Sequence, residues 1–301
     1  MQGSFLQILG IYALTCMIWG STWLAIRIGL ESMPPIISAG YRFTLAALLI
    51  LGVISIKKIK IQTDPIAIKL YLAMAFLSFV IPYGLIYWAE LFVPSGLTAI
   101  LYAVYPFSIA IFSFLMIPSE KIGINKIIGI VISFTGLYVI FSGSFTGNLD
   151  NYLLGLIAVF VSAIMQSSIA VSIKKYGHHL HPLAMNFYPM LIAGIVLLIY
   201  GFIIEGHLQI KYDYKAFFSV FYLALFGSLI TFTSYYWLIK RVNIVIVSLI
   251  TFITPIIALF LGWFFYNEQL SLHQLAGCLL VLVGLLAAIF GNIGKVLRKK
   301  I

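Results

Sequence analysis

Long apolar runs recur along the whole sequence, and short polar segments separate them. Each run has about 20 residues, the length that an α-helix needs to cross the roughly 30 Å hydrocarbon core of a bilayer. The pattern therefore predicts an all-α polytopic membrane protein with ten transmembrane helices. The predicted spans are residues 8–27, 35–56, 68–88, 95–117, 124–142, 152–173, 183–204, 216–238, 244–266 and 273–293.

Composition supports the same class. Hydrophobic residues make up 63% of the 301 residues and charged residues 9%, whereas soluble domains are about half apolar and about a quarter charged. The first apolar run has no basic segment before it and no evident small-residue cleavage site, so a removable signal peptide is not expected. We expect this run to remain as the first transmembrane helix.

The net charge of +10 would also suit a nucleic-acid-binding protein, but the positions of Lys and Arg favour a membrane explanation. With the N-terminus inside, fourteen of the eighteen basic residues fall in cytoplasmic segments. Arg27, Lys211 and Lys215 fall outside, and Arg42 lies within a span. Because cytoplasmic loops carry an excess of Lys and Arg, both termini are predicted to be cytoplasmic. The basic C-terminal tail is expected near anionic lipid, and no nucleic-acid partner is expected.

Cysteine and histidine give no indication of a cofactor or a metal site. Cys16 and Cys278 fall within predicted spans, where a small packing residue is the expected role. His178, His179 and His181 lie together in a predicted cytoplasmic loop with no Cys or acidic residue beside them. A solvated loop is therefore favoured over metal binding. The sequence also lacks a glycine-rich nucleotide-binding loop.

The two halves of the chain share a skeleton of marker residues. Trp88 and Pro106 recur as Trp237 and Pro255, in each case 149 positions later. Similar shifts relate Pro35 to Pro182, Glu120 to Glu268, Gly129 to Gly277 and Gly136 to Gly284. This skeleton predicts two five-helix repeats, residues 1–147 and 148–301. An odd number of helices inverts the second repeat in the bilayer, and inverted repeats around a midplane site are a common transporter architecture.

Three stretches carry a resemblance to a known family: IWGSTWLAIRIGLESMPPIISAGYRF, WAELFVPSGLTAIL and YLALFGSLITFTSYYWLIKRV. They resemble the EamA family of the drug/metabolite transporter superfamily, and the similarity runs over essentially the whole chain. The resemblance implies a ten-helix carrier of the bacterial inner membrane that moves small metabolites, often by export. It also implies a central cavity lined chiefly by helices one, three, four, six, eight and nine. Members of the family carry different substrates, so the solute is not implied.

Helix three offers one stripe of cavity candidates. Tyr83, Tyr87 and Glu90 are spaced by four and three residues, so they are expected on one helix face. This face would join an aromatic lining to a carboxylate. An aromatic belt at the outer membrane interface is the alternative, because Tyr is enriched there.

Helix four offers a second stripe next to a proline. Thr98, Tyr102 and Tyr105 are predicted on one face, and Pro106 follows them. Proline removes an intrahelical hydrogen bond, and such a break can expose backbone carbonyls or provide a hinge. A simple packing kink is the alternative.

Polar side chains on other spans complete the predicted cavity. Gln166 is favoured because a mid-span amide has four hydrogen-bonding positions to satisfy. Trp19 and Trp23 are expected on different sides of helix one, and Trp19 is assigned to the cavity with Thr22. The remaining candidates are Thr231 and Tyr235 on helix eight and Ser248 and Thr251 on helix nine. Each Ser or Thr can instead bond back to its own helix or to a neighbour.

Helices five and ten carry small residues on one face. Gly129 and Gly136 lie on helix five, and Gly277 and Gly284 lie on helix ten. Small residues let helix backbones approach closely. Both helices are therefore predicted to serve packing.

Arg42 is the one strong charge well within a span, about two turns from the predicted outer end of helix two. An isolated intramembrane charge is costly enough to need a partner. Arg27, Glu31 and Glu90 are expected at the same level. An ion-paired cluster that contains Arg42 and Glu90 could form an outer gate. A static clamp or a snorkelling side chain is the alternative.

Together these features favour a secondary transporter that exports solutes by alternating access, with an importer or exchanger of the same fold as the alternative. A membrane-embedded enzyme would need clustered His, Asp or Glu at membrane depth, which the spans do not supply. A receptor would not need the duplication. The aromatic and hydroxyl-rich lining favours small amphipathic solutes such as amino acids. Glu90 is the candidate for proton coupling, whereas substrate exchange would need no titrating carboxylate.

Overall fold

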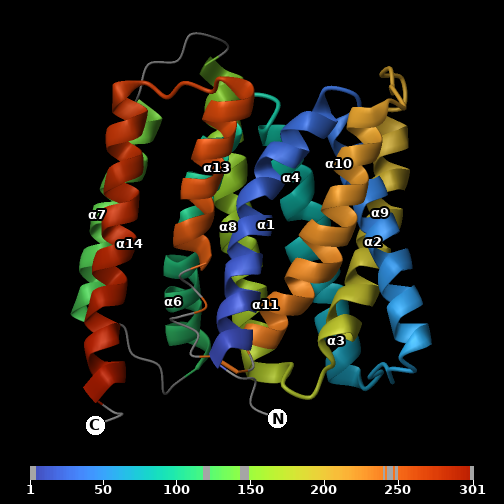
Figure 1. Ribbon diagram of the computed structural model, residues 1–301, viewed down its shortest axis with the longest axis horizontal. Helices are drawn as coiled ribbons and strands as arrows, with labels where there is room; N and C mark the ends of the chain where they lie inside the picture. Colours follow the sequence, from blue (N-terminus) through green and yellow to red (C-terminus); the bar gives the residue numbers. More distant parts are fainter. Residues whose placement is uncertain are drawn as a thin grey trace.

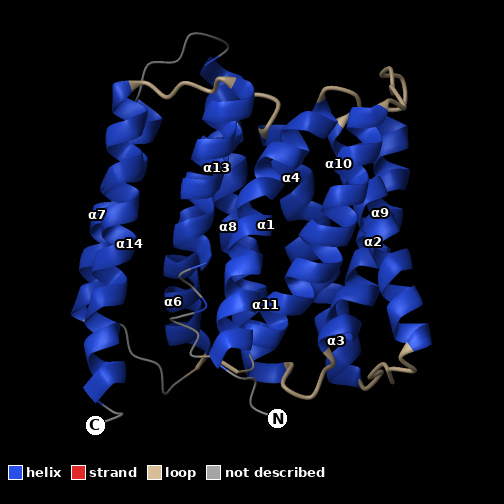
Figure 2. Ribbon diagram, in the orientation of Figure 1, coloured by secondary structure: helices blue, strands red, loops and turns tan. Residues whose placement is uncertain are grey.

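The apolar runs fold into long helices that lie side by side in one bundle (Figure 1). The computed structural model describes residues 5–117, 123–142, 149–239, 241–242, 247 and 250–298. Within these ranges the regular structure is helical throughout, and loops join the helices at the two ends of the bundle (Figure 2). The expected all-α class is confirmed for these residues.

The first half of the chain contains helices α1 to α7. They are α1 (Phe5–Leu30), α2 (Pro35–Ile56), α3 (Pro65–Met74), α4 (Ile81–Ala89), α5 (Ser95–Leu101), α6 (Tyr105–Met116) and α7 (Ile124–Ser142). A π-helical turn, η1 (Ala75–Val80), joins α3 to α4, and a 3₁₀ turn, η2 (Tyr102–Val104), joins α5 to α6. Each joined set forms one continuous helical segment, Pro65–Ala89 and Ser95–Met116.

The second half repeats this arrangement in its described part. Its helices are α8 (Leu149–Tyr176), α9 (Pro182–Ile204), α10 (Tyr214–Ala224), α11 (Thr231–Ile239), α13 (Ile250–Tyr266) and α14 (Leu272–Arg298). A second π-helical turn, η3 (Leu225–Ile230), joins α10 to α11. Single π-helical turns are rare and are frequent at functional sites. The helices that contain η1 and η3 are therefore candidates for the functional site.

Proline and aspartate start several helices for local reasons. Pro35 is the first residue of α2, where its missing N–H would have no helical partner in any case. The Asp64 carboxylate accepts a hydrogen bond from the N–H of Ala67 at 3.1 Å. Asp213 accepts one from the N–H of Ala216 at 3.0 Å. These caps satisfy backbone donors that the first turn of a helix leaves unpaired.

Length and hydropathy mark seven of the described helical segments as able to cross a membrane. They are Phe5–Leu30, Pro35–Ile56, Pro65–Ala89, Ser95–Met116, Asp150–Tyr176, Pro182–Ile204 and Tyr214–Ile239. Shorter apolar helices lie at Ile127–Ile140, Ile253–Tyr266 and Leu272–Gly284. Large apolar side chains cover outward faces, for example Ile203 at 75% and Leu279 at 63% exposure. The protein is a polytopic helical membrane protein, and its ten-span topology remains a prediction.

Glycine faces bring α7 and α14 close together at one edge of the bundle (Figure 1). A Cβ atom on Gly136 would lie 2.6 Å from the carbonyl oxygen of Gly277, and one on Gly277 would lie 2.7 Å from that of Gly136. At the opposite edge α2 packs along α9, where Gly40 faces Leu198. The remaining helices enclose the centre, so α7 and α14 have the packing role predicted for them.

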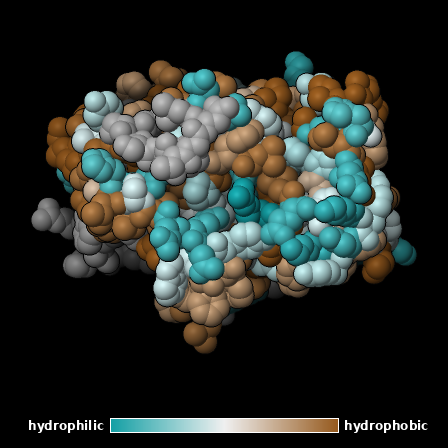
Figure 3. Space-filling model, turned by 90° about the horizontal axis from the view of Figure 1, so that it is seen from above, coloured by the Kyte–Doolittle hydropathy of each residue, from teal (hydrophilic) through white to brown (hydrophobic). Residues whose placement is uncertain are grey.

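The start of α1 and the end of α14 lie at the same end of the bundle, which we call the terminal end (Figure 1). The other end, the distal end, carries the connections α1–α2, α9–α10 and α13–α14. Figure 3 looks onto the distal end. Hydrophilic side chains gather over its middle and right-hand part, and apolar side chains lie mostly around its rim.

Candidate functional site

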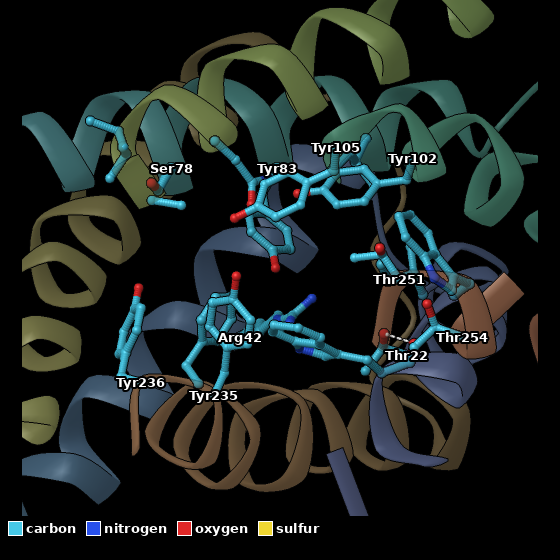
Figure 4. A pocket seen from close by; sticks show the side chains of 18 of the residues that line it. Thr22, Arg42, Ser78, Tyr83, Tyr102, Tyr105, Tyr235, Tyr236, Thr251 and Thr254 are labelled. Carbon is cyan, nitrogen blue, oxygen red and sulfur yellow. Dashed lines mark hydrogen bonds between the residues drawn. The ribbon is translucent and has the colours of Figure 1, made fainter. Parts of the chain in front are cut away.

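A small cavity lies inside the bundle, between α1, α2, α4, α6, α8, α11 and α13 (Figure 4). Its volume is about 80 Å³, whereas pockets that hold small-molecule ligands usually measure roughly 300–1,000 Å³. Aromatic, hydroxyl and aliphatic side chains line it together with one arginine. A solute larger than a few atoms therefore needs the surrounding helices to move apart.

Most of the residues predicted for a cavity line this one. Those that do are Trp19, Thr22, Tyr83, Tyr102, Tyr105, Gln166, Tyr235 and Thr251. Tyr87, Thr98 and Thr231 are buried but are not part of the lining. Ser248 lies outside the described residues. The roles of all these residues in solute binding remain predictions.

Aromatic rings form two facing walls. In Figure 4, Tyr83, Tyr102 and Tyr105 project from one side of the cavity, and Tyr235 and Tyr236 project from the other. The rings of Tyr102 and Tyr105 are stacked, with centroids 5.5 Å apart. The 3₁₀ turn explains this contact, because side chains three residues apart are in line when there are about 3.0 residues per turn.

Both tryptophans of α1 line the cavity, so the expectation that only Trp19 faces it was wrong. Residues four apart differ by only about 40° around an α-helix, and one broad face can hold both. The Trp19 ring lies 4.9 Å from that of Tyr235. The Trp23 ring lies 5.5 Å from that of Tyr102. Trp19 and Trp23 thus contact opposite walls.

The expected stripe on helix three does not continue beyond Tyr83. Ile86, three residues after Tyr83, lines the cavity, whereas Tyr87 is fully buried and faces Arg42 of α2. Glu90 is also fully buried and does not line the cavity. The face that reaches the cavity is therefore rotated by about one position from the predicted face.

Arg42 lines the cavity and is held by the π-helical turn η3. Its Nε donates to the hydroxyl of Ser228 at 3.1 Å, and its Nη2 donates to the carbonyl of Gly227 at 3.3 Å. Its Nη1 lies 3.4 Å from the hydroxyl of Tyr87. The guanidinium carbon also lies 4.8 Å from the centre of the Tyr83 ring, within the range of a cation–π contact. A π-helical turn disturbs the regular ladder of helix hydrogen bonds, which explains why a carbonyl here can accept from a side chain.

The predicted ion pair between Arg42 and Glu90 is not formed. Neither carboxylate oxygen of Glu90 has a hydrogen-bond partner. Arg27 donates to the backbone carbonyl of Glu90 and not to its carboxylate. Glu31, expected in the same cluster, pairs with Lys215. Arg42 instead donates to uncharged acceptors of η3, which lie within hydrogen-bond distance, whereas the Glu90 carboxylate does not.

Several hydroxyl groups form hydrogen bonds within their own helices, which is the alternative to solute binding that the sequence analysis left open for Ser and Thr. Thr98 donates to the carbonyl of Pro94 at 3.1 Å, and Thr231 donates to that of Phe226. Thr22 donates to the carbonyl of Trp19 at 2.8 Å although it lines the cavity. Gln166 differs, because its amide nitrogen is buried and makes no hydrogen bond. It is a donor available to a bound solute.

Polar contacts join the two halves of the chain at the distal end. The Glu268 carboxylate accepts hydrogen bonds from the N–H of Ser95 at 3.0 Å and from that of Gly96 at 3.2 Å. It thereby caps the start of α5. Ser32 donates to Asp213 at 2.8 Å.

Glu31 makes further contacts between the two halves at the same end. Glu31 binds Lys215 and accepts from the hydroxyl of Tyr266. The N–H of Ala216, aided by the hydroxyl of Ser32, lowers the pKa of Asp213. Asp213 therefore keeps its charge at neutral pH.

A second hollow lies on the terminal side of the cavity. It has a volume of about 400 Å³. Ile173 and Tyr236 line both hollows, and Lys174, His178 and Met185 line the second one alone.

Sequence reasoning missed several lining residues. They are Trp23, Ile26, Ser78, Ile86, Ile169, Ala170, Ile173, Phe232, Tyr236 and Thr254. Most lie three, four or seven residues from a predicted lining residue, so helical periodicity could have found them. Ser78 lies within the π-helical turn η1 and five residues before Tyr83, and the wider turn brings both to the cavity. The sequence carries no evident signal for that turn.

The fold and the cavity together define the class of the protein. A polar and aromatic cavity enclosed by membrane helices is the architecture of membrane carriers. The described residues contain no group of three or more His, Cys, Asp or Glu that could hold a metal ion. The chain belongs to the EamA-like transporter family, whose family model matches residues 7–142 and 153–290. It is a membrane transporter.

Known relatives resemble the chain over most of its length. It is 27% identical over 293 residues to YoaV of Bacillus subtilis, an uncharacterised transporter, covering 97% of this chain and 98% of the relative. It is 34% identical over 260 residues to YedA of Escherichia coli strain K12, an uncharacterised inner membrane transporter, covering 84% and 81%. A protein of known crystal structure with 15% identity superposes with a TM-score of 0.70 and covers 96% of this chain and 99% of its own. That likeness shows a shared fold.

Proposed function

We propose that the protein is a secondary transporter that exports small amphipathic metabolites, such as amino acids, across the bacterial inner membrane by alternating access. The central cavity carries this proposal. It combines facing aromatic walls with hydroxyl and amide groups, and a second hollow borders it on the terminal side. A site that is accessible from one side in one state is what alternating access requires.

Internal symmetry supports ten spans in two inverted repeats, residues 1–147 and 148–301. The π-helical turns η1 and η3 begin 150 positions apart. α1 packs against α13 and α11, and α8 packs against α6 and α4, which are the equivalent pairs with the two halves exchanged. The family model also matches each half separately. An exchange of arrangements between equivalent halves would turn the present state into one open to the distal side.

Charge supports an orientation in which the terminal end faces the cytoplasm. Lys58, Lys60, Lys174 and Lys175 belong to loops or helix ends at the terminal side, whereas the distal side carries few basic residues. Positive charge collects on the cytoplasmic side of membrane proteins. The cavity would then be open to the cytoplasm, from which an exporter takes its solute. The name of the Escherichia coli relative supports an inner-membrane location.

Coupling is proposed to be either proton antiport or solute exchange. Glu90 supports the first option because it is a fully buried carboxylate with no hydrogen-bond partner. A carboxylate in such surroundings is easier to bury when it carries a proton. The exchange option needs no such group.

Solute counterflow in proteoliposomes tests the carrier function. Liposomes loaded with unlabelled amino acids should transiently accumulate an external radiolabelled amino-acid mixture. Trp19→Ala should reduce this overshoot because it removes part of the cavity wall. Trp263→Ala is the matched control, since Trp263 is 60% exposed on the outer surface of α13. Uptake no greater than in protein-free liposomes would contradict the proposal. Lower amino-acid content in expressing cells than in control cells would indicate export.

A further inference from the structure

Arg42 is a buried cation in the cavity wall that forms no direct ion pair with a described carboxylate, and the buried Glu90 carboxylate interacts with it only through space. The Arg42 side chain is 1% exposed. The ion pairs between described residues are those of His179 with Asp64 and of Lys215 with Glu31, and Arg42 takes part in neither. Burial of an unpaired charge is strongly unfavourable, and intramembrane charges are kept for functional reasons.

The local structure holds Arg42 without neutralising it. Its hydrogen-bond partners are uncharged: the hydroxyls of Ser228 and Tyr87, the carbonyl of Gly227 and the side chain of Tyr83. A guanidinium has five N–H groups, so these four partners do not use all of its donors. A guanidinium is also the side chain best suited to bind a carboxylate.

A second donor lies in the same cavity. The amide nitrogen of Gln166 is buried and makes no hydrogen bond, and Gln166 belongs to α8, across the cavity from α2. A buried donor without an acceptor is costly. Two elements far apart in sequence thus present donors that only an acceptor-rich solute would satisfy.

We propose that Arg42 binds the carboxylate of the transported solute, with Gln166 as a further donor. The substrates are then small organic acids with a single carboxylate and an apolar or aromatic body, amino acids included. This inference rests on the proposed carrier function and adds the chemical class of its substrate. It also gives Arg42 a binding role in place of the gate role expected from the sequence.

The composition of the lining selects this class over other anions. Among the described residues of the lining, Arg42 is the one charged side chain. One guanidinium balances one negative charge, whereas a phosphate dianion would need more cations. The lining also includes Trp19, which contacts Phe232 and Tyr235, and these rings suit an apolar or aromatic body.

Matched pairs of probes test the inference on the unmodified protein. Phenylacetate and phenylacetamide share one body and differ in charge, as do isovalerate and isovaleramide. Trp19 and Trp23 line the cavity, so quenching of tryptophan fluorescence in purified protein reports occupancy. Each acid should bind about 10- to 100-fold more tightly than its amide, because hydrogen bonds that involve a charged partner are the stronger ones. Phenylphosphonate, a dianion on a similar ring, should bind more weakly than phenylacetate.

Variants then assign the effect to Arg42. Arg42→Gln should abolish the preference for acid over amide, and Arg42→Lys should keep only part of it because a lysine cannot bind both oxygens in a fixed geometry. Arg241→Gln is the matched control, since Arg241 is exposed and lies over Trp237 away from the cavity. If Arg42→Gln does not fold, Ser228→Ala, which removes the acceptor of Nε, should still weaken acid binding selectively.

Two kinds of result would overturn the inference. Equal binding of acid and amide, or tighter binding of phenylphosphonate, would show that Arg42 does not select a carboxylate, while the carrier function would stand if counterflow is observed. Binding by none of the acids would also count against it. Absence of counterflow for every amino acid, with normal acid binding, would instead reject transport and leave the binding site in place.

Discussion

The contact of Glu268 with the start of α5 should set the balance between the two states of the transporter. The carboxylate accepts from two backbone N–H groups and from the hydroxyl of Ser95. Loss of a helix N-cap costs about 0.5–2 kcal/mol, and loss of a negative charge at a helix start costs about 0.3–1 kcal/mol. If this contact exists only while the distal end is closed, Glu268→Ala should favour distal opening by about 1–3 kcal/mol, or roughly 5- to 150-fold.

The assay for this shift is chemical access to the cavity. Ser78 lines the cavity, so the substitution Ser78→Cys places a thiol there. The substitution is made in a background in which the buried Cys16 and Cys278 are replaced. A membrane-impermeant thiol reagent applied to the distal side should then react about 5- to 150-fold faster when Glu268→Ala is added, provided that opening is fast compared with labelling.

Glu205→Ala is the matched control for Glu268→Ala. Glu205 caps the start of α2, where its carboxylate accepts from Ile36 and Ile37 at 2.9 and 3.1 Å. This contact joins α2 to α9, which pack along each other and are expected to move together. Its loss should lower thermal stability without changing distal access. Unchanged labelling in Glu268→Ala, or an equal increase in both variants, would show that the Glu268 contact does not hold the distal end closed.

Three further predictions concern packing, coupling and topology. Gly277→Ala should lower the melting temperature of the purified protein, because the added methyl group would lie 2.7 Å from the carbonyl oxygen of Gly136. Such overpacking costs about 1–3 kcal/mol. Gly52→Ala is the control and should not lower the melting temperature, because a methyl group at Gly52 would meet no atom within 4 Å. Glu90→Gln should retain counterflow but abolish transport driven by a proton gradient if Glu90 carries the coupled proton; retention of both would favour exchange. In intact cells, an impermeant thiol reagent should label a cysteine at Asp150 and not one at Lys58, and the reverse pattern would overturn the proposed orientation.

Helix positions and much of the cavity could be predicted from the sequence because both follow from periodic patterns. Apolar runs of membrane-spanning length placed the helices, and polar side chains within those runs pointed inward. Gln166 and Tyr235 were found in this way. The glycine faces of α7 and α14 were also predictable, because small residues in membrane helices usually mark close packing.

The π-helical turns could not be predicted, and they explain the main errors. A π-helical turn changes which residues share a helix face. α-Helical spacing therefore did not predict that Ser78 and Tyr83 line the same cavity. The turn η3 also provides acceptors for Arg42, and a reading based on charge alone paired Arg42 with Glu90. Partners that are backbone carbonyls or hydroxyl groups leave no charge signal in the sequence.

The most direct test of the account is to block the cavity reversibly during transport. In proteoliposomes that contain Ser78→Cys in the cysteine-replaced background, counterflow is measured before and after reaction with a small methanethiosulfonate and again after reduction. Leu279→Cys, on the exposed face of α14, is the control. Modification of Ser78→Cys should stop counterflow and reduction should restore it, whereas modification of Leu279→Cys should have no effect. Undiminished counterflow through fully modified Ser78→Cys would contradict the claim that solutes pass through this cavity.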